Sequence, residues 1–171
     1  GASPSPNRKN FNDQSYLFDG TNDYINRPHD LKLNIPDELS ISAWIKVDSY
    51  KHNVVLAKGN TWDNNYDYHL AIESQGALSF AWRPYLQGGR GVQTANNLIP
   101  LNQWTLITAT HTSGNQPKLY INGIQQAVTA NGDQSSPRHS YNQDMTIGMN
   151  NRPVVGERGY FAGNLDEIRI Y

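Results

Sequence analysis

The amino-acid sequence predicts an all-β protein, a sandwich of two antiparallel sheets. Apolar and polar residues alternate with a period of two in many short segments, which is the pattern of half-buried strands. Turn residues such as Gly, Asn, Asp and Pro separate these segments at intervals of roughly 8–12 residues. A chain of 171 residues is long enough for one domain with a sizeable core, and this length favours a sandwich over a barrel.

The C-terminal segment, residues 161–171, is predicted to be a strand with an interruption. Its apolar side chains occupy odd-numbered positions up to Leu165 and even-numbered positions from Ile168 onward. Successive side chains of a strand point to opposite faces, so a regular strand would turn one of these two sets away from the core. The simplest solution is a bulge at Asp166 and Glu167, which inserts one residue and re-aims its neighbours.

A partner for this strand lies near the other end of the chain, in residues 16–20 followed by 23–25. We expect the two terminal segments to pair, and this pairing is expected to bring Asp19 and Asp166 close together. Two carboxylates held close need a proton or a cation between them, which makes this pair a candidate cation site.

The internal strands follow the same period of two. Residues 39–47 alternate most clearly, and Asn122-Gly123 is the strongest hairpin signal, because a type I′ turn needs a positive φ at both central positions. Trp44, Trp82 and Trp104 lie within strand patterns, and we assign all three to the core, although the parity of Trp44 opposes that of its aliphatic neighbours. The remaining expected strands are residues 53–58, 66–73, 78–83, 105–111, 117–122 and 144–149.

Composition excludes several classes of function. The formal net charge is −1 and the basic residues form no cluster, which argues against a nucleic-acid-binding surface. No apolar run is long enough to cross a bilayer, so we expect no membrane insertion. The absence of cysteine excludes disulfides and thiolate metal sites. We interpret residues 1–14 as a linker or cloning remnant and residues 15–171 as the folded domain.

A series of motifs, taken in order, resembles the laminin G-like, concanavalin A-like domain family over residues 15–171. The motifs are FDG at 18–20, DY at 23–24, ISAWI at 41–45, GAL at 76–78, QWTLI at 103–107, LYING at 119–123, IG at 147–148 and FAGNLDEIRIY at 161–171. The resemblance implies a jelly roll with adjacent terminal strands. It also implies an extracellular module that binds glycans or proteins, with a structural Ca²⁺ near those strands.

The expected calcium ligands are four oxygen-bearing residues. Asp19 and Asp166 match positions where the resembled domains place ligands, and the sequence adds Asn22 and Asp23. Two alternatives stay open: Asp19 and Asn22 can cap a turn, and Asp166 can pair with Arg169. Zinc is less favoured, because the histidines lack the short spacings of a zinc motif.

The ligand surface is predicted from aromatic and planar polar residues, which suit the ring faces and hydroxyls of sugars. These residues lie in an Asn- and Asp-rich loop, on the strand face opposite the aliphatic one, in a Gly-rich loop, and on loops that flank residues 144–149. An ordinary surface with cross-strand pairs is the alternative. The candidate ligand-binding residues are Trp62, Asp67, His69, Arg83, Tyr85, Arg90, Tyr141 and Arg152.

The sequence favours a non-catalytic carbohydrate-binding module of a larger secreted or cell-surface protein. A catalytic role is not expected, because no close pair of carboxylates and no nucleophile elbow is present. The expected partner is a polysaccharide or glycan, and contacts from both Arg83 and Arg90 would favour an acidic or sulfated one. A calcium-supported domain that binds proteins and a spacer without a ligand are the alternatives. We expect a monomer and an extracellular location.

Overall fold

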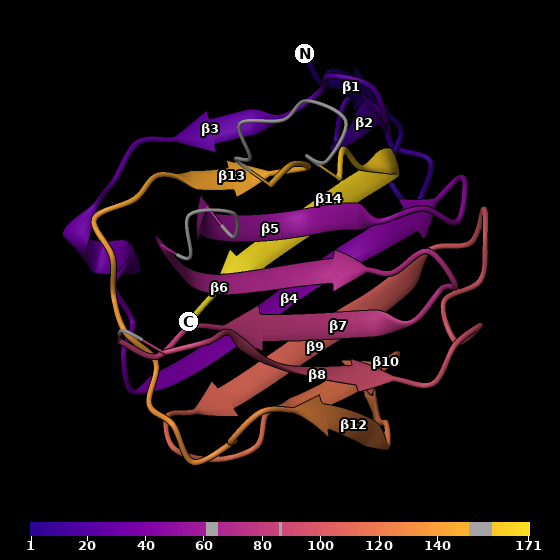
Figure 1. The fold of residues 1–171 in the computed structure, drawn as a ribbon. Helices are drawn as coiled ribbons and strands as arrows, with labels where there is room; N and C mark the ends of the chain where they lie inside the picture. Colours follow the sequence, from indigo (N-terminus) through magenta and orange to yellow (C-terminus); the bar gives the residue numbers. More distant parts are fainter. Residues whose placement is uncertain (61–64, 86, 151–158) are drawn as a thin grey trace.

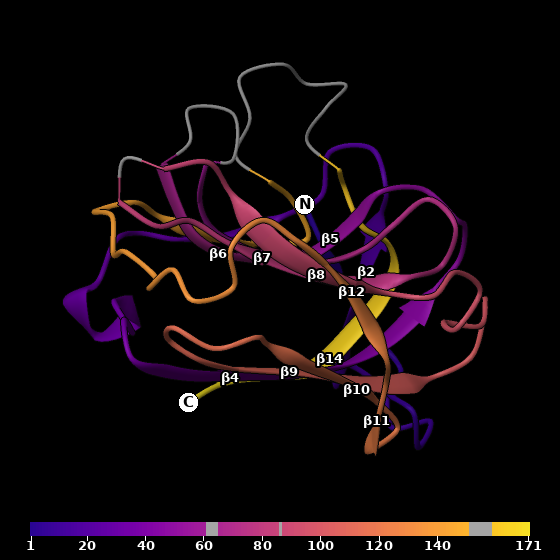
Figure 2. The ribbon, with the colours of Figure 1, turned by 60° about the horizontal axis from the view of Figure 1, so that its bottom comes forward.

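Two antiparallel sheets pack face to face in this protein, as the sequence predicts (Figures 1 and 2). The structure is a computed structural model, and it describes residues 1–60, 65–85, 87–150 and 159–171. The first sheet runs in the spatial order β1 (Ser3–Ser5), β2 (Ser15–Asp19), β14 (Ala162–Ile170), β4 (Glu38–Val47), β9 (Thr105–Thr112), β10 (Lys118–Ile121) and β11 (Ile124–Gln125). The second sheet runs in the order β12 (Val128–Asn131), β8 (Arg90–Thr94), β7 (Leu78–Trp82), β6 (Asn65–Ile72), β5 (Asn53–Asn60), β13 (Met145–Ile147) and β3 (Ile25–Arg27).

Helix is limited, within the described residues, to one 3-10 turn, η1 (Leu31–Leu33). No helix in this part of the chain has the length and apolar character needed to span a membrane. The two packed antiparallel sheets confirm the jelly-roll arrangement inferred from the strand pattern and the motif series.

The core lies between the two sheets and follows from the alternation of side chains along the strands. Every second residue of β4, from Leu39 to Val47, is buried, and the intervening side chains face outward. Trp82 is fully buried, and its indole N–H donates a hydrogen bond to the carbonyl of Ser136 at 3.1 Å. Trp44 and Trp104 are only partly buried, so their assignment to the core is wrong. The parity of β4 places Trp44 on the outer face of the first sheet.

The terminal strands β2 and β14 pair as expected, and β14 lies between β2 and β4. The segment that follows β2 does not join them, because β3 pairs with β13 in the second sheet. The predicted bulge is confirmed: the pairing of β14 with β4 shifts register between Asp166 and Arg169, and Glu167 has a φ of 46°. The register with β2, however, places Asp19 opposite Ala162, four positions along β14 from Asp166. Because a strand rises about 3.3 Å per residue, the two carboxylates lie roughly 13 Å apart along the strand, and their predicted approach is wrong.

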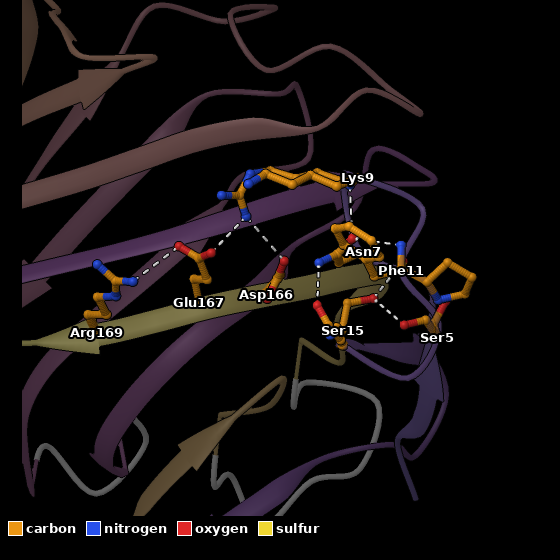
Figure 3. A network of polar contacts seen from close by, with 11 residues as sticks. Ser5, Asn7, Lys9, Phe11, Ser15, Asp166, Glu167 and Arg169 are labelled. Atoms are coloured by element: carbon orange, nitrogen blue, oxygen red, sulfur yellow. Dashed lines mark hydrogen bonds and ion pairs between the residues drawn. The ribbon is translucent and has the colours of Figure 1, made fainter.

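The N-terminal segment, expected outside the fold, contributes to the first sheet (Figure 3). Strand β1 pairs with β2, and Arg8 forms ion pairs with Glu167 at 2.9 Å and Asp166 at 3.4 Å. The Arg8 guanidinium also lies 4.7 Å from the centre of the Trp44 ring, a cation–π contact that covers this outward-facing indole. The sequence pattern missed β1 because this strand has too few residues to show an alternation. The domain boundary at residue 15 stays a prediction.

A buried His–Arg pair ties the loop between β12 and β13 to the core. Arg138 donates hydrogen bonds to the ring of His111 and, at 2.9 Å, to the carbonyl of Ile35. The His111 ring packs against Trp82, with 4.3 Å between the ring centres. Burial, together with the charge of Arg138, lowers the pKa of His111 to about 3.

Stability is therefore expected to fall as the pH falls below about 6.5, because the unfolded chain binds a proton at His111 that the folded state accepts only near pH 3. Urea unfolding at pH 7, 6 and 5 would show a loss of up to about 1 kcal/mol per pH unit. The variant His111→Gln keeps an acceptor for Arg138 but does not titrate, so its unfolding free energy should depend less on pH. His139→Gln, which alters a partly exposed histidine, is the control; an equal slope in the wild type and in His111→Gln would contradict this account.

Candidate functional site

The outer face of the second sheet holds a groove of about 720 Å³. Inward side chains of β6, β7 and β8, such as Leu70, Phe80 and Val92, fill the core, so their neighbours in sequence face outward. The strand register arranges these outward residues in two rows across four strands. One row is His69, Ala81, Gly91 and Asn131, and the other is Ala71, Ser79, Gln93 and Thr129. The centre of the groove is shallow because Ala81 and Gly91 project little from the sheet.

One end of the groove holds the carboxylate of Glu73, which is fixed from two sides. Ser79 donates a hydrogen bond to one carboxylate oxygen, and the ring of His52 lies 3.0 Å from the other. His52 in turn stacks on His69, with 5.5 Å between the ring centres. Burial by itself would raise the pKa of Glu73, but the hydrogen bonds from His52 and Ser79 outweigh it and lower the pKa to about 2. Glu73 is therefore ionised at neutral pH.

The other end of the groove is formed by Tyr66, Gly89 and Arg90. The Arg90 side chain donates hydrogen bonds to the carbonyls of Gly88 at 2.8 Å and Asp133 at 3.1 Å, and to the side chain of Gln87 at 3.0 Å. All three of its nitrogens are engaged in this way. Arg90 thus fastens the loop before β8 to the turn after β12, and it fixes the shape of this end of the groove.

Next to this end lies a cluster of three rings, Tyr85, His139 and Tyr141. The centre of the His139 ring lies 4.6 Å from the centres of both tyrosine rings. Tyr85 is 60% exposed, so the cluster presents an aromatic surface to solvent. It adjoins the groove at Tyr66, a lining residue whose pKa is raised by burial and, in addition, by the nearby Tyr141.

A buried ion pair holds this cluster in place. Lys58 and Asp67 are 0% and 2% exposed, and the ammonium nitrogen lies 2.9 Å from a carboxylate oxygen. Lys58 also donates to the carbonyl of Tyr141 at 2.7 Å, and Asp67 accepts from its backbone N–H at 2.7 Å. The pair therefore binds both backbone groups of one loop residue. Burial raises the pKa of Asp67, and the hydrogen bond from Lys58 opposes that effect.

The structure brings several of the predicted ligand-binding residues together and redefines others. Tyr85 and Tyr141 share the aromatic cluster, and His69 and Arg90 line the groove. Asp67 is not available on the surface, because it is buried in an ion pair with Lys58. Lys58 lies on β5, the strand that pairs with β6. Arg83 directly follows β7, and its carbonyl accepts a hydrogen bond from the N–H of His139 at 3.0 Å. Trp62 and Arg152 lie outside the described residues.

Sequence reasoning missed the polar residues of the groove on β8 and β12. Gln93, Thr129 and Asn131 line it, yet both strands are too short to give a clear alternation. The strand register would have identified these three residues, because each one lies in a row with an outward-facing residue of β7. Such a register depends on which strands pair and cannot be read from one segment alone.

Asp19, Asn22 and Asp23 share one turn, whereas Asp166, the fourth predicted calcium ligand, lies apart from them on β14. Asp19 accepts hydrogen bonds from the N–H groups of Thr21 and Asn22, which makes it the turn-capping residue of the alternative interpretation. Asp23 accepts from the N–H of Asp19 at 3.0 Å. Asp166 pairs with Arg8 and not with Arg169, which pairs with Glu167. Among the described residues, no three His, Asp or Glu side chains are placed to hold a metal ion.

A lysine ammonium supplies positive charge at this corner of the molecule. Lys51 donates a hydrogen bond from its ammonium group to the carbonyl of Gly20, next to Asp19. Burial lowers the pKa of Lys51, and the carboxylate of Asp19 opposes that effect. Hydrogen bonds and an ion pair thus engage oxygens of Asp19, Asp23 and Asp166, and Asp166 lies apart from the turn, so the four residues do not form the single ligand set that was predicted. Structural calcium stays a prediction that lacks a ligand set in the described residues.

Comparison with known proteins identifies the family and the fold. Residues 19–171 match the family described as the concanavalin A-like lectin/glucanases superfamily. No curated protein sequence matches the chain.

Solved structures with the same fold share little sequence with this chain. Domain 4 of AbnA, a GH43 extracellular arabinanase from Geobacillus stearothermophilus in complex with arabinotriose, has a TM-score of 0.65 at 18% identity, covering 100% of this chain and 75% of that one. The CBM40 of the Ruminococcus gnavus IT-sialidase, bound to α2,3-sialyllactose, has a TM-score of 0.66 at 18% identity, covering 88% of this chain and 90% of that one. Domains LG4-5 of the mouse laminin α1 chain have a TM-score of 0.64 at 14% identity, covering 91% and 40% of the two chains. At these identities the likeness shows the fold alone.

The Lys58–Asp67 pair gives a prediction for stability. Asp67→Asn leaves the Lys58 ammonium buried without its counter-charge, so we expect the free energy of unfolding to fall by about 3–5 kcal/mol. Chemical denaturation measures this loss. The double variant Lys58→Met/Asp67→Leu removes both charges and should recover a large part of it. A loss below about 1 kcal/mol in Asp67→Asn would show that the charge pair is not the anchor of the loop.

The Lys51 contact gives a prediction about calcium. A structural ion bound at a hundred times its dissociation constant would stabilise the fold by about 2.7 kcal/mol. We expect instead the same melting temperature in Ca²⁺ and in EDTA. Lys51→Ala should lower the unfolding free energy by about 1 kcal/mol, because the Gly20 carbonyl loses its donor. Lys118→Ala, at an exposed position of β10, is the control. A melting temperature that rises with Ca²⁺ in the wild type would contradict this assignment.

Proposed function

This chain belongs to the concanavalin A-like lectin/glucanases superfamily, and we propose that it is a non-catalytic carbohydrate-binding module whose ligand site is the groove of the second sheet. The observation that supports this most directly is the lining of the groove. Hydroxyl and amide side chains from β7, β8 and β12 surround a floor of small residues. Sugars present hydroxyl groups around flat ring faces, so a ring can lie on Ala81 and Gly91 while Gln93 and Asn131 bond to its hydroxyls.

The aromatic cluster extends this site. Tyr85, His139 and Tyr141 form an exposed aromatic surface beyond Tyr66, where a further sugar ring can pack against the tyrosine faces. Binding there needs little reorganisation, because the Lys58–Asp67 pair holds Tyr141 by its backbone. A polymer that lies along the groove would contact the polar rows and the cluster together.

The carboxylates of the site support a binding role and not a catalytic one. Glycosidases place two carboxyl groups within about 10 Å of each other across the scissile bond. Within the described residues that line the groove, Glu73 is the one carboxylate. Asp67 is buried in its ion pair with Lys58, and six positions of β6 separate it from Glu73.

The likeness to a domain of an extracellular arabinanase and to a sialidase CBM40, both with a bound sugar, supports a secreted or cell-surface module within a larger protein, with a glycan as partner. A neutral, polar surface gives no reason to expect more than a monomer. The alternative of a calcium-supported, protein-binding domain relied on loops around a calcium site. Asp166 lies apart from the other three predicted ligands of that site, and no specific observation favours this alternative.

Affinity electrophoresis in gels that contain a panel of polysaccharides tests the proposed site. We expect at least one polymer to retard the protein. Ala81→Trp places a large side chain in the middle of the groove and should weaken binding about tenfold or more, a loss of roughly 1.4 kcal/mol. Thr108→Trp, on the outer face of the first sheet, is the matched control and should bind like the wild type. Equal binding by both variants would move the ligand site away from the groove.

Trp62→Ala tests the sequence-based prediction that this tryptophan contacts the ligand. We expect reduced retardation by the same polymer, because the variant removes the apolar indole face on which a sugar ring would stack. Retardation equal to that of the wild type, at an unchanged melting temperature, would return Trp62 to the ordinary surface.

A further inference from the structure

We infer that the groove selects neutral glycans over acidic or sulfated ones, and that Glu73 is the residue that sets this selection. The inference rests on the proposed function and specifies the chemical class of its ligand. It reverses the expectation that Arg83 and Arg90 together would favour an acidic polymer.

The first argument is the charge that lines the groove. The carboxylate of Glu73 is held in place by Ser79 and His52, and its side chain is 30% exposed, so it faces a ligand without being free to swing away. A bound uronate or sulfate group would lie close to this fixed negative charge, in a site that excludes part of the screening water. Like charges at such distances repel strongly at the reduced dielectric of a protein surface. A sugar hydroxyl, in contrast, can donate a hydrogen bond to the same carboxylate.

The second argument is that the cation at the far end of the groove is already engaged. Arg90 donates from all three nitrogens to protein oxygens, at 2.8 Å to Gly88, 3.0 Å to Gln87 and 3.1 Å to Asp133. Arg has five N–H donors and these bonds use three of them, so a two-pronged contact with a carboxylate or sulfate has to form with the N–H groups that remain or displace one of these protein oxygens. Lysine does not occur among the described residues that line the groove. The remaining lining residues offer hydroxyl, amide and imidazole groups.

The fold itself leaves the choice open. Two structures that share it are complexes with ligands of different charge, arabinotriose in one and sialyllactose, which carries a carboxylate, in the other. The distinction must therefore come from the side chains of the groove in each protein. In this chain those side chains place one fixed anion in the site and engage the nearby guanidinium.

The experiment measures the affinity of the intact chain for neutral polymers (arabinan, galactomannan, mixed-linkage β-glucan) and acidic polymers (polygalacturonate, alginate, chondroitin sulfate). Low salt and pH 8, above the range in which histidine ordinarily titrates, keep the contrast of charges sharp. We expect a neutral polymer to bind and the acidic polymers to bind about tenfold more weakly or not at all. Added salt should narrow this gap, a result that needs no variant.

Glu73→Gln keeps the shape of the side chain and removes its charge. It should strengthen binding of acidic polymers about tenfold while neutral binding changes only a few-fold. Glu38→Gln, at an exposed position of the first sheet, is the matched control and should change neither. An unchanged melting temperature shows that the Glu73 variant is folded. If the variant does not fold, the salt dependence of binding by the wild type tests the inference instead.

The outcomes separate the inference from the proposed function. Acidic polymers that bind the wild type as tightly as neutral ones, with binding lost in Ala81→Trp, would overturn the neutral selection and leave the groove as the ligand site. If that acidic binding were lost in Arg83→Gln instead, the anion contact would lie beside the aromatic cluster and the inference would again fail. No binding of any polymer would overturn the proposed function and the inference with it.

Discussion

The pairing of β14 between β2 and β4 is the constraint on which the rest of this structure depends. It joins the two ends of the chain and completes the first sheet, against which the second sheet packs (Figure 2). The bulge after Asp166 lets both halves of β14 direct apolar side chains toward the core. Gly163 permits the close approach of β4, because a Cβ at this position would lie 2.0 Å from the carbonyl oxygen of Lys46.

Buried polar pairs connect this frame to the proposed ligand surface. Lys58 and Asp67 bind the backbone of Tyr141, and Arg138 with His111 anchors the start of the same connection between β12 and β13. Each pair keeps a long loop in one conformation without adding to the core. A charged group buried in this way is costly if its partner is lost, so these pairs specify the loop conformation more than they add to net stability. The aromatic cluster of the site depends on them.

The groove shows how a sheet can build a site from residues that are ordinary one by one. The same alternation that sends Leu70, Phe80 and Val92 into the core sends a set of small and polar neighbours to the outer face. Cross-strand pairing then aligns these neighbours into rows. Two sets of hydrogen bonds add to the chemistry of the site. One holds the carboxylate of Glu73, and the other binds the Arg90 side chain to its neighbouring loops. Local hydrogen bonding therefore decides how these two charged side chains are held at the surface.

The sequence by itself determined what depends on neighbours along the chain: the all-β class, the longer strands, the type I′ turn at Asn122-Gly123, where both φ angles are positive, and the bulge in the last strand. It also selected Tyr85 and Tyr141, which the structure brings together around His139. Only the tertiary structure decided register and partners. The strand register separates Asp19 from Asp166. Asp67 forms a buried ion pair with Lys58, and Arg90 donates hydrogen bonds to the loops beside it. Alternation is a property of one strand, whereas register and the reach of a charged side chain depend on which segments the fold brings together.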